Sequence, residues 1–255
     1  VIFSHKVNFF RILQNFLYNY LSIMNFFRSL IFYFVFYLWT FFFFVFFSQV
    51  RFFSDSFIIS LSNFWSRSVV LICKKILLID YEVLGEENIP KKGPFLITSN
   101  HQSAWETFFF TALFKGSVFI LKDELKNIPI FSRYFKRLGF IFIKRDQGLN
   151  SIRVINRSVS SLIKRGKTKF IIFPEGTRTD PDKIAKINPG FFAIHKLTKV
   201  PILPVIHNSG RFWINKKFIK KNGKINVKIF PLLKSNYKKD KVLNNIETRF
   251  RSSPF

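Results

Sequence analysis

The chain has 255 residues and carries 41 Lys and Arg against 14 Asp and Glu, a formal net charge of +27. This length suffices for one sizeable domain plus a membrane segment. Its one cysteine, Cys73, excludes an intramolecular disulfide framework and favours a domain that faces the cytoplasm. The charge favours partners that present dense phosphate, either nucleic acid or an anionic membrane surface. Because AT-rich codons also explain the 38 Phe and many of the Lys, the charge alone does not decide between them.

Residues 1–28 are interpreted as an N-terminal extension. The only methionine is Met24, although the chain begins with Val1. We therefore predict that translation starts at Met24, in which case residues 1–23 have no role. The alternative is an amphipathic surface helix, since apolar side chains recur through the extension: Phe9, Phe10, Ile12, Leu13, Phe16 and Leu17.

Residues 29–79 are predicted to anchor the chain in a membrane. The run 29–50 is uncharged, and about 20 helical residues span a bilayer core. It is too long for a signal peptide, and no small-residue cleavage site follows it. The second apolar stretch, 57–79, is interrupted by Arg67 and by Lys74, so we expect it to lie in the interface or enter the membrane only partly.

Residues 80–255 are predicted to form an α/β domain with a mixed, largely parallel sheet flanked by helices. Apolar runs bounded by turn residues predict seven strands: 81–84, 95–99, 118–121, 140–143, 169–173, 202–206 and 225–230. Apolar residues at helical spacing predict a helix over 149–165, with Gly166 as its C-terminal stop.

A histidine and a carboxylate follow the second predicted strand. The segment reads Asn100-His101-Gln102-Ser103-Ala104-Trp105-Glu106. His101 and Glu106 have the residue types of a base and the group that orients it. Ser103 and Glu106 also match a capping box, which places His101 just before a helix and folds Glu106 back toward it. Capping alone is the alternative interpretation, and it predicts nearly the same geometry.

A second polar turn follows the fifth predicted strand. It reads Phe173-Pro174-Glu175-Gly176-Thr177-Arg178-Thr179. The guanidinium fork of Arg178 suits a phosphate or carboxylate ligand. The alternative role for Glu175 is a plain salt bridge to Arg178.

These two segments resemble the glycerolipid acyltransferase family, and within it the bacterial 1-acyl-sn-glycerol-3-phosphate (lysophosphatidate) acyltransferases. Residues 139–146 are similar to the family's second block, and residues 200–205 to its fourth. The resemblance covers roughly residues 81–231. Four blocks in family order are a far more specific signal than any one of them.

The resemblance implies that His101 takes the proton of a lysophospholipid hydroxyl, whose oxygen then attacks an acyl thioester to form phosphatidate. Glu106 would orient His101. The family more often has aspartate here, and we regard the HX4E form as a tolerated departure. Arg145 and Arg178 are the expected phosphate ligands, with the pocket shaped by Glu175, Gly176 and Thr177.

The expected partners are the lysophospholipid acceptor, acyl-CoA or acyl carrier protein as the acyl donor, and anionic membrane lipids, without nucleic acid. No cofactor or metal is expected, because no zinc-like spacing of ligands occurs. His195 and His207 are interpreted as surface or core residues. The expected location is the bacterial cytoplasmic (inner) membrane, with the catalytic domain facing the cytoplasm.

Two other functions remain open at this point. The first is an acyltransferase of the same fold that acts on another lysolipid or an amino-lipid. The second is a non-enzymatic basic protein that binds membranes or nucleic acid, with binding that weakens steeply with salt and does not depend on His101.

Overall fold

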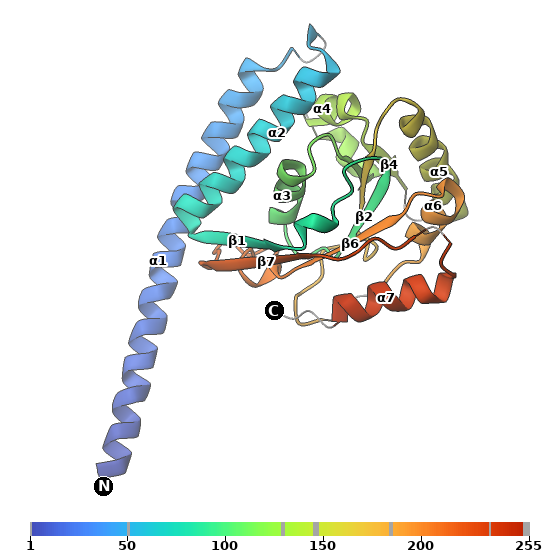
Figure 1. The fold of residues 1–255 in the computed structure, drawn as a ribbon. Coiled ribbons are helices and arrows are strands. Elements are labelled where there is room, and N and C mark those ends of the chain that lie inside the picture. Colours follow the sequence, from blue (N-terminus) through green and yellow to red (C-terminus); the bar gives the residue numbers. More distant parts are fainter. Residues whose placement is uncertain are drawn as a thin grey trace.

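The computed structural model describes residues 2–49, 52–128, 131–144, 148–183, 186–234 and 236–251. Within these residues a seven-stranded sheet, ordered β1-β7-β6-β2-β5-β3-β4, forms the centre of the domain (Figure 1). The strands are β1 (Ile79–Leu84), β2 (Phe95–Ser99), β3 (Val118–Lys122), β4 (Ile141–Ile143), β5 (Lys169–Ile172), β6 (Ile202–His207) and β7 (Gly223–Ile229). Neighbouring strands are parallel except β6 and β7, which are antiparallel. The predicted mixed, largely parallel sheet is confirmed.

All seven predicted strands are present. β1 and β7 each begin two residues earlier than predicted, because Ile79 pairs with Gly223 and extends their shared ladder. The predicted helix 149–165 is α5 (Leu149–Lys164). Gly166 ends it with a φ of 81°, and the N–H of Lys167 donates to the carbonyl of Leu162 at 2.9 Å, as expected of a glycine stop.

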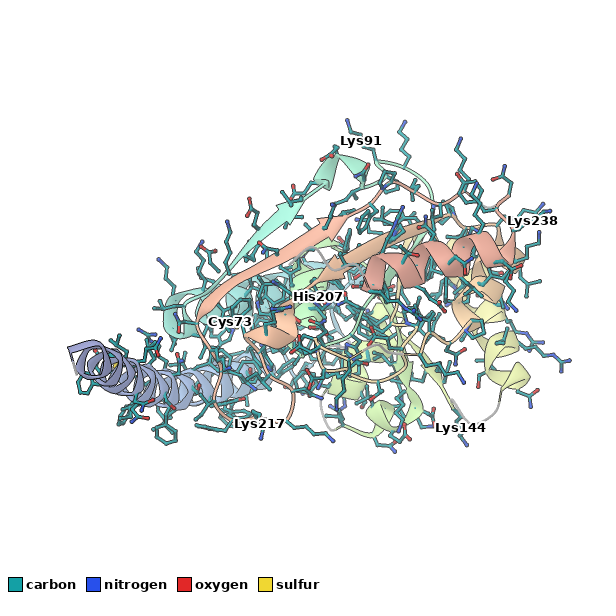
Figure 2. All side chains as sticks on the ribbon, turned by 90° about the horizontal axis from the view of Figure 1, so that it is seen from below. Cys73, Lys91, Lys144, His207, Lys217 and Lys238 are labelled. Atoms are coloured by element: carbon teal, nitrogen blue, oxygen red, sulfur yellow. The ribbon has the colours of Figure 1, made fainter. Side chains whose placement is uncertain are left out.

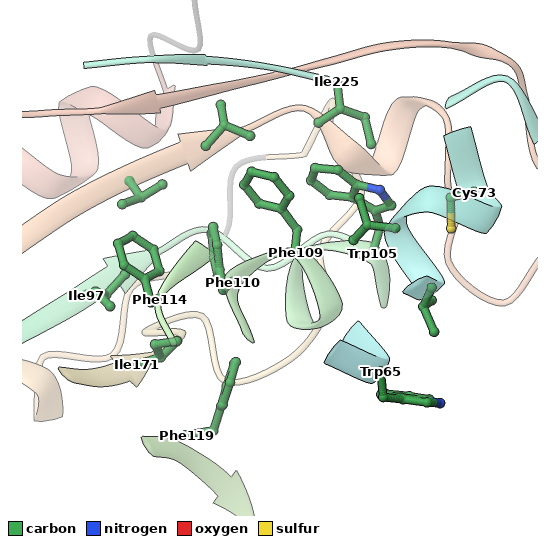
Figure 3. Packing of buried hydrophobic residues seen from close by; sticks show 14 of the residues in the cluster. Trp65, Cys73, Ile97, Trp105, Phe109, Phe110, Phe114, Phe119, Ile171 and Ile225 are labelled. Atoms are coloured by element: carbon green, nitrogen blue, oxygen red, sulfur yellow. The ribbon is translucent and has the colours of Figure 1, made fainter. Parts of the chain in front are cut away.

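Helices cover both faces of the sheet. One face packs against α1 (Ile2–Phe46), α2 (Asp55–Ile72), α3 (Trp105–Leu113) and α4 (Phe131–Leu138). The other packs against α5, α6 (Gly190–Thr198) and α7 (Lys239–Arg251). Alternation along the strands produces the two cores: Ile97 belongs to the first and its neighbour Leu96 to the second. In the first core, Phe109 and Phe110 of α3 face the sheet (Figure 3).

Short helical turns complete the fold. A π-helical turn, Cys73–Leu77, continues α2, and 3-10 turns occupy Glu86–Asn88, Asp123–Asn127 and Ser209–Arg211. Cys73 is fully buried, as expected of a structural thiol.

Among the described residues, two helices are long and apolar enough to cross a membrane, Gln14–Phe46 with mean hydropathy 2.1 and Asp55–Leu77 with 1.4. The first part of α1 projects away from the domain (Figure 1). In the later part of α1, Phe32 and Phe43 pack into the first core, whereas aromatic residues such as Phe34 and Phe41 are exposed on the other side of the helix. The translation start at Met24 and the boundaries of the three predicted regions remain predictions.

Candidate active site

The candidate site lies where β6, β2 and β5 end, because these parallel neighbours bring their carboxyl ends to one edge of the sheet. The loop after β2 carries His101, and the turn after β5 carries Glu175 and Arg178. The backbone N–H of His101 donates to Oε1 of Glu175 at 3.3 Å. The N–H of Thr179 donates to the carbonyl of His101 at 2.7 Å. The two sequence motifs therefore meet directly.

Glu106 folds back over the start of α3 as predicted, but the capping box is only half formed. The N–H of Ser103 donates to Oε1 of Glu106 at 2.8 Å. The N-cap, however, is Ala104, one residue later than predicted, and it makes no side-chain cap. The Ser103 hydroxyl instead donates to Oε2 of Glu106 and accepts the N–H of Trp105. The prediction of Ser103 as N-cap is therefore wrong, because the buried carboxylate binds its hydroxyl.

Hydrogen-bond donors surround the carboxylate of Glu106, which is fully buried. Oε1 accepts Nδ1–H of His101 at 2.9 Å and two backbone N–H groups of the preceding loop. Oε2 accepts the hydroxyl of Ser209 at 2.8 Å in addition to that of Ser103. Burial alone would raise the pKa of Glu106, but the hydrogen bonds that its carboxylate accepts from His101 and Ser103 outweigh burial and hold the pKa below its ordinary value. This carboxylate is negatively charged at neutral pH.

The imidazole of His101 is held in one tautomer. A carboxylate can only accept, so Nδ1 carries the hydrogen and Nε2 keeps a free lone pair. The ring stacks on Phe173 with centroids 4.1 Å apart and planes at 14°. The side chain remains 15% exposed, so a substrate can reach it. His101 thus has the geometry of an oriented general base.

Glu175 is the second carboxyl of the site, and its environment is different. Its Oε1 accepts the His101 N–H, whereas Oε2 is buried without a partner in the described residues. Burial raises the pKa of Glu175 to about 7, outweighing the hydrogen bonds from Thr179 and His101, and the charge of Glu106 acts in the same direction. No ion pair joins Glu175 to Arg178 in the described residues, so the plain salt bridge is not formed.

The remaining predicted phosphate residues lie on the same turn, with one exception. Gly176 has a φ of 72° and closes the turn through its N–H to the carbonyl of Phe173 at 3.0 Å. Thr177 and Arg178 are exposed at the mouth of the site. Arg145 lies outside the described residues.

Three polar residues that support Glu106 were not assigned from the sequence. Asn100 bridges the ends of β2 and β6: its Nδ2 donates to the carbonyl of His207 at 2.8 Å, and its Oδ1 accepts the N–H of His207 at 3.1 Å. Nε2 of His207 lies 3.0 Å from the carbonyl of Asn100 and therefore donates to it. Burial lowers the pKa of His207 and keeps this core histidine neutral. Ser209 lies in the loop after β6, and no local pattern identifies it.

Two cavities meet at Arg178. One, of about 210 Å³, lies between α1, α2, α3 and α4 and is mostly apolar, with walls that include Phe44, Trp65 and Phe131. The other, of about 700 Å³, is polar and includes Thr177. Arg178 lines both. This arrangement suits an amphiphile with a hydrocarbon tail and an anionic head.

A family model described as Acyltransferase matches residues 80–208. The chain belongs to the acyltransferase family. It is 36% identical over 169 residues to a 1-acyl-sn-glycerol-3-phosphate acyltransferase of Pseudomonas aeruginosa, covering 66% of this chain and 65% of the relative. It is 29% identical over 176 residues to the protein of that name from Saccharomyces cerevisiae, covering 67% of this chain and 57% of the relative. The match thus spans less than two thirds of either relative.

The fold has a solved counterpart. The crystal structure of the 1-acyl-sn-glycerophosphate (LPA) acyltransferase, PlsC, from Thermotoga maritima superposes with a TM-score of 0.73 at 23% identity, covering 91% of this chain and 97% of that one. This likeness extends over the helices that precede the family match as well as the sheet. The predicted resemblance to acyltransferases is confirmed.

Proposed function

We propose that this protein is a membrane-bound 1-acyl-sn-glycerol-3-phosphate O-acyltransferase. It transfers an acyl chain from acyl-CoA or acyl carrier protein to the sn-2 hydroxyl of lysophosphatidate and forms phosphatidate. The observation that carries this proposal is the oriented imidazole of His101, fixed by the charged Glu106, close to the turn that carries Arg178. The names of the aligned relatives support the choice of acceptor.

The geometry supports a direct transfer. Nε2 of His101 takes the proton of the acceptor hydroxyl as its oxygen attacks the thioester carbonyl carbon. The tetrahedral adduct collapses, the carbon–sulfur bond breaks, and the proton on His101 passes to the leaving sulfur. The free thiol departs and the neutral imidazole is restored. The charge of Glu106 stabilises the imidazolium that exists between the two proton transfers.

The chain's own residues suffice for this reaction, so the proposal includes no cofactor and no metal. Within the described part of the chain, no three His, Cys, Asp or Glu side chains are arranged to hold a metal ion. Arg178 is the phosphate ligand of the acceptor, with Arg145 as the second proposed ligand. Glu175, Gly176 and Thr177 shape the turn that presents Arg178.

The proposed location is the bacterial cytoplasmic membrane, with the catalytic domain on the cytoplasmic side. Lysophosphatidate and phosphatidate are membrane lipids, and the two apolar helices line the cavity that would receive a hydrocarbon chain. The high positive charge favours attachment to anionic lipids. The substrate can therefore reach His101 without leaving the bilayer surface.

The proposal is tested by acyl transfer in membranes that contain the wild-type protein or His101→Ala, with lysophosphatidate and radiolabelled acyl-CoA or acyl carrier protein. We expect wild-type membranes to form phosphatidate and His101→Ala to lose about 10²- to 10⁴-fold in rate. His195→Ala is the matched control, because His195 is a buried histidine that lies in α6 on the opposite face of the sheet.

Each other outcome has a definite meaning. If the protein acylates another lysolipid or an amino-lipid but not lysophosphatidate, the proposed acceptor is wrong and the proposed acyl-transfer chemistry stands. No transfer to any acceptor by a folded wild-type protein would contradict the proposal. Equal rates for His101→Ala and wild type would remove His101 from the mechanism.

A further inference from the structure

The polar cavity that Arg178 lines continues toward α7. A further cavity, of about 280 Å³, adjoins it and has several lining residues in common with it, among them Lys183 and Arg211. This further cavity is also lined by Phe250 and Arg251 at the end of α7. Within the described part of the chain it shares no lining residue with the apolar cavity. Arg178 therefore marks the end of the polar cavity that meets the apolar cavity, and Arg211 marks the end that meets α7.

The packing of three loops holds Arg211 at this end. The residue before it, Gly210, lies so close to the loops after β2 and β5 that a Cβ there would come within 2.9 Å of Cβ of Gln102 and 2.7 Å of Cγ of Pro181. The N–H of Gly210 also donates to Oε1 of Gln102 at 3.1 Å. The guanidinium of Arg211 lies 3.8 Å from the exposed carboxylate of Asp182, a pairing of the weak surface kind. Its N–H groups thus remain available to a ligand.

The polar cavity is positively charged. Five cationic side chains line it against two carboxylates, a formal net charge of +3: Arg178, Lys183, Arg211, Lys216 and Lys221 against Asp180 and Asp182. Cavity walls that carry mainly one sign of charge concentrate ligands of the opposite sign. The volume of about 700 Å³ is typical of a site for a whole small molecule, so the glycerol phosphate head of an acceptor fills only part of it. Room for a second anionic group remains.

The two substrates of the proposed reaction place their phosphates differently. In lysophosphatidate the phosphate is attached at C3, next to the carbon that carries the reacting hydroxyl, so it binds close to His101, at the Arg178 end. In the acyl donor a long pantetheine arm separates the thioester sulfur from the nearest phosphate, which therefore binds farther away. The donor head is also water-soluble, and α7 lies on the face of the sheet opposite the apolar helices α1 and α2. The Arg211 end meets both conditions.

We propose that Arg211, together with Lys183, binds the phosphate of the 4′-phosphopantetheine group of the acyl donor. This inference rests on the proposed function, because it places the second substrate of the same reaction. Phosphopantetheine is common to acyl-CoA and acyl carrier protein, and a guanidinium fork suits its phosphate. Arg211 positions the donor and takes no part in proton transfer, which belongs to His101.

The first test compares donors with and without the phosphate. In Arg211→Gln we expect kcat/KM for acyl-CoA and acyl carrier protein to fall about 10- to 100-fold, as when a hydrogen bond to a charged group is lost. Transfer from acyl-pantetheine, which has the same thioester arm without its phosphate, should keep the wild-type rate, as should the KM for lysophosphatidate. Arg211→Lys should recover part of the loss, because it restores the charge without the fork.

Matched controls separate the position of these charges from their number. Arg157→Gln removes an exposed arginine of α5 that lines none of the three cavities, and it should change no donor. Lys183→Met should weaken the phosphorylated donors less than Arg211→Gln does, because an ammonium lacks the two-point geometry of a guanidinium. Its control is Lys238→Met, at an exposed lysine before α7 that lies at the edge of the molecule (Figure 2).

Direct binding separates this inference from the proposed function. CoA is titrated into the purified full chain in detergent and its binding is measured by calorimetry, without acyl transfer. Its Kd should rise about 10- to 100-fold in Arg211→Gln but not in Arg157→Gln. Carrier protein is the second arm: the holo form bears phosphopantetheine and should lose affinity in Arg211→Gln, whereas the apo form lacks the group and should not. A loss confined to one arm supports the inference and identifies the donor.

The opposite results are equally clear. If the wild type forms phosphatidate while Arg211→Gln slows acyl-CoA, acyl carrier protein and acyl-pantetheine alike, Arg211 has a structural role and the inference is wrong. If the KM for lysophosphatidate rises instead of that for the donor, the cavity serves the acceptor and the inference is again wrong. In both cases the proposed function stands. If CoA or holo carrier protein binding depends on Arg211 but no phosphatidate forms, the donor site stands and the proposed function fails.

Discussion

Two glutamates contact His101 from two different segments, and their environments are opposite. Glu106, from the first turn of α3, binds the Nδ1 of His101, is fully buried, and receives hydrogen bonds on both oxygens. Glu175, from the turn after β5, binds the backbone N–H of the same histidine and leaves Oε2 buried without a partner in the described residues. The pKa of Glu106 is lowered, whereas burial raises that of Glu175 to about 7.

The number of donors therefore decides what burial does to a carboxyl group. Desolvation raises the pKa of both residues, and only the donors around Glu106 reverse its effect. A charged Glu106 can orient and stabilise a protonated His101 at any pH near neutrality. Glu175 changes its charge in the same pH range, beside the turn that presents Arg178. The two carboxyl groups thus suit different tasks: the charge of Glu106 is constant near neutral pH, whereas the charge of Glu175 depends on the pH.

Removing the charge of Glu106 should have the largest effect. In Glu106→Gln we expect kcat to fall about 10²- to 10⁴-fold, because the imidazolium loses its counter-charge and the tautomer of His101 is no longer enforced. Acyl-transfer kinetics with saturating lysophosphatidate measure this change. Glu106→Asp, which keeps the charge, should retain more activity than Glu106→Gln, and equal losses in the two variants would contradict a role for the charge.

The same residue should also control acid stability. Because the folded pKa of Glu106 lies below its ordinary value of 4.5, its stabilising effect is present above about pH 4.5 and is lost as the pH falls through the folded pKa. Acid unfolding followed by circular dichroism should therefore begin below this pH in the wild type. The part of that loss which comes from Glu106 should be absent in Glu106→Gln.

Glu175 should show the opposite sign. Its folded pKa of about 7 exceeds the ordinary 4.5, so between these values the unfolded chain releases a proton that the folded protein keeps, and stability falls as the pH rises. In Glu175→Gln this fall, on the order of 3 kcal/mol, should disappear. Thermal unfolding at pH 4.5, 6 and 8 measures it.

The control for this prediction is Glu87→Gln, at an exposed position of the Glu86–Asn88 turn. It should change the pH dependence of unfolding far less than Glu175→Gln. The prediction is contradicted if the wild-type stability stays level or rises between pH 4.5 and 7 and Glu175→Gln behaves in the same way. Glu175 would then ionise normally, and the pKa values of the two carboxyl groups would not differ as described.

A smaller effect is expected at Ser209, which supplies one of the two hydroxyl donors to Oε2 of Glu106. Ser209→Ala removes one hydrogen bond to a charged acceptor and should lower the free energy of unfolding by about 1.5 kcal/mol. Because Ser103 still donates to the same oxygen, kcat should fall less than about tenfold. A loss as large as that of Glu106→Gln would mean that Ser209 itself contacts the substrate.

Much of this fold is encoded locally. The seven strands were predictable because each is a short apolar run ended by turn residues, and α5 because its apolar residues repeat at helical spacing and stop at Gly166. His101 and Glu106, like Glu175 and Arg178, were found because each pair lies within one short motif. In these cases the residues that define the feature are neighbours in sequence.

What the sequence missed depends on contacts between distant segments. Ser209 donates to Glu106 and, through its N–H, to His207 only because β6 lies beside β2. No local sequence pattern predicts this pairing of strands. Arg211 lines the polar cavity only because Gly210 packs against Gln102 and Pro181. The N-cap of α3 was misplaced by one residue because the Ser103 hydroxyl is bound by a carboxylate whose burial is itself a tertiary effect.

The smallest effect is expected at the uncharged contact between the loop after β2, which carries His101, and the turn after β5, which begins with Phe173. Phe173 stacks on His101, and Phe173→Leu keeps an apolar side chain while removing the ring, so we expect a loss of about 1 kcal/mol and a several-fold lower kcat. Phe192→Leu is the control, because Phe192 lies against the non-catalytic His195 with centroids 5.7 Å apart. It should lower stability to a similar degree without changing kcat. If both variants reduced kcat equally, stacking would contribute nothing specific to His101, and its orientation would depend on Glu106 alone.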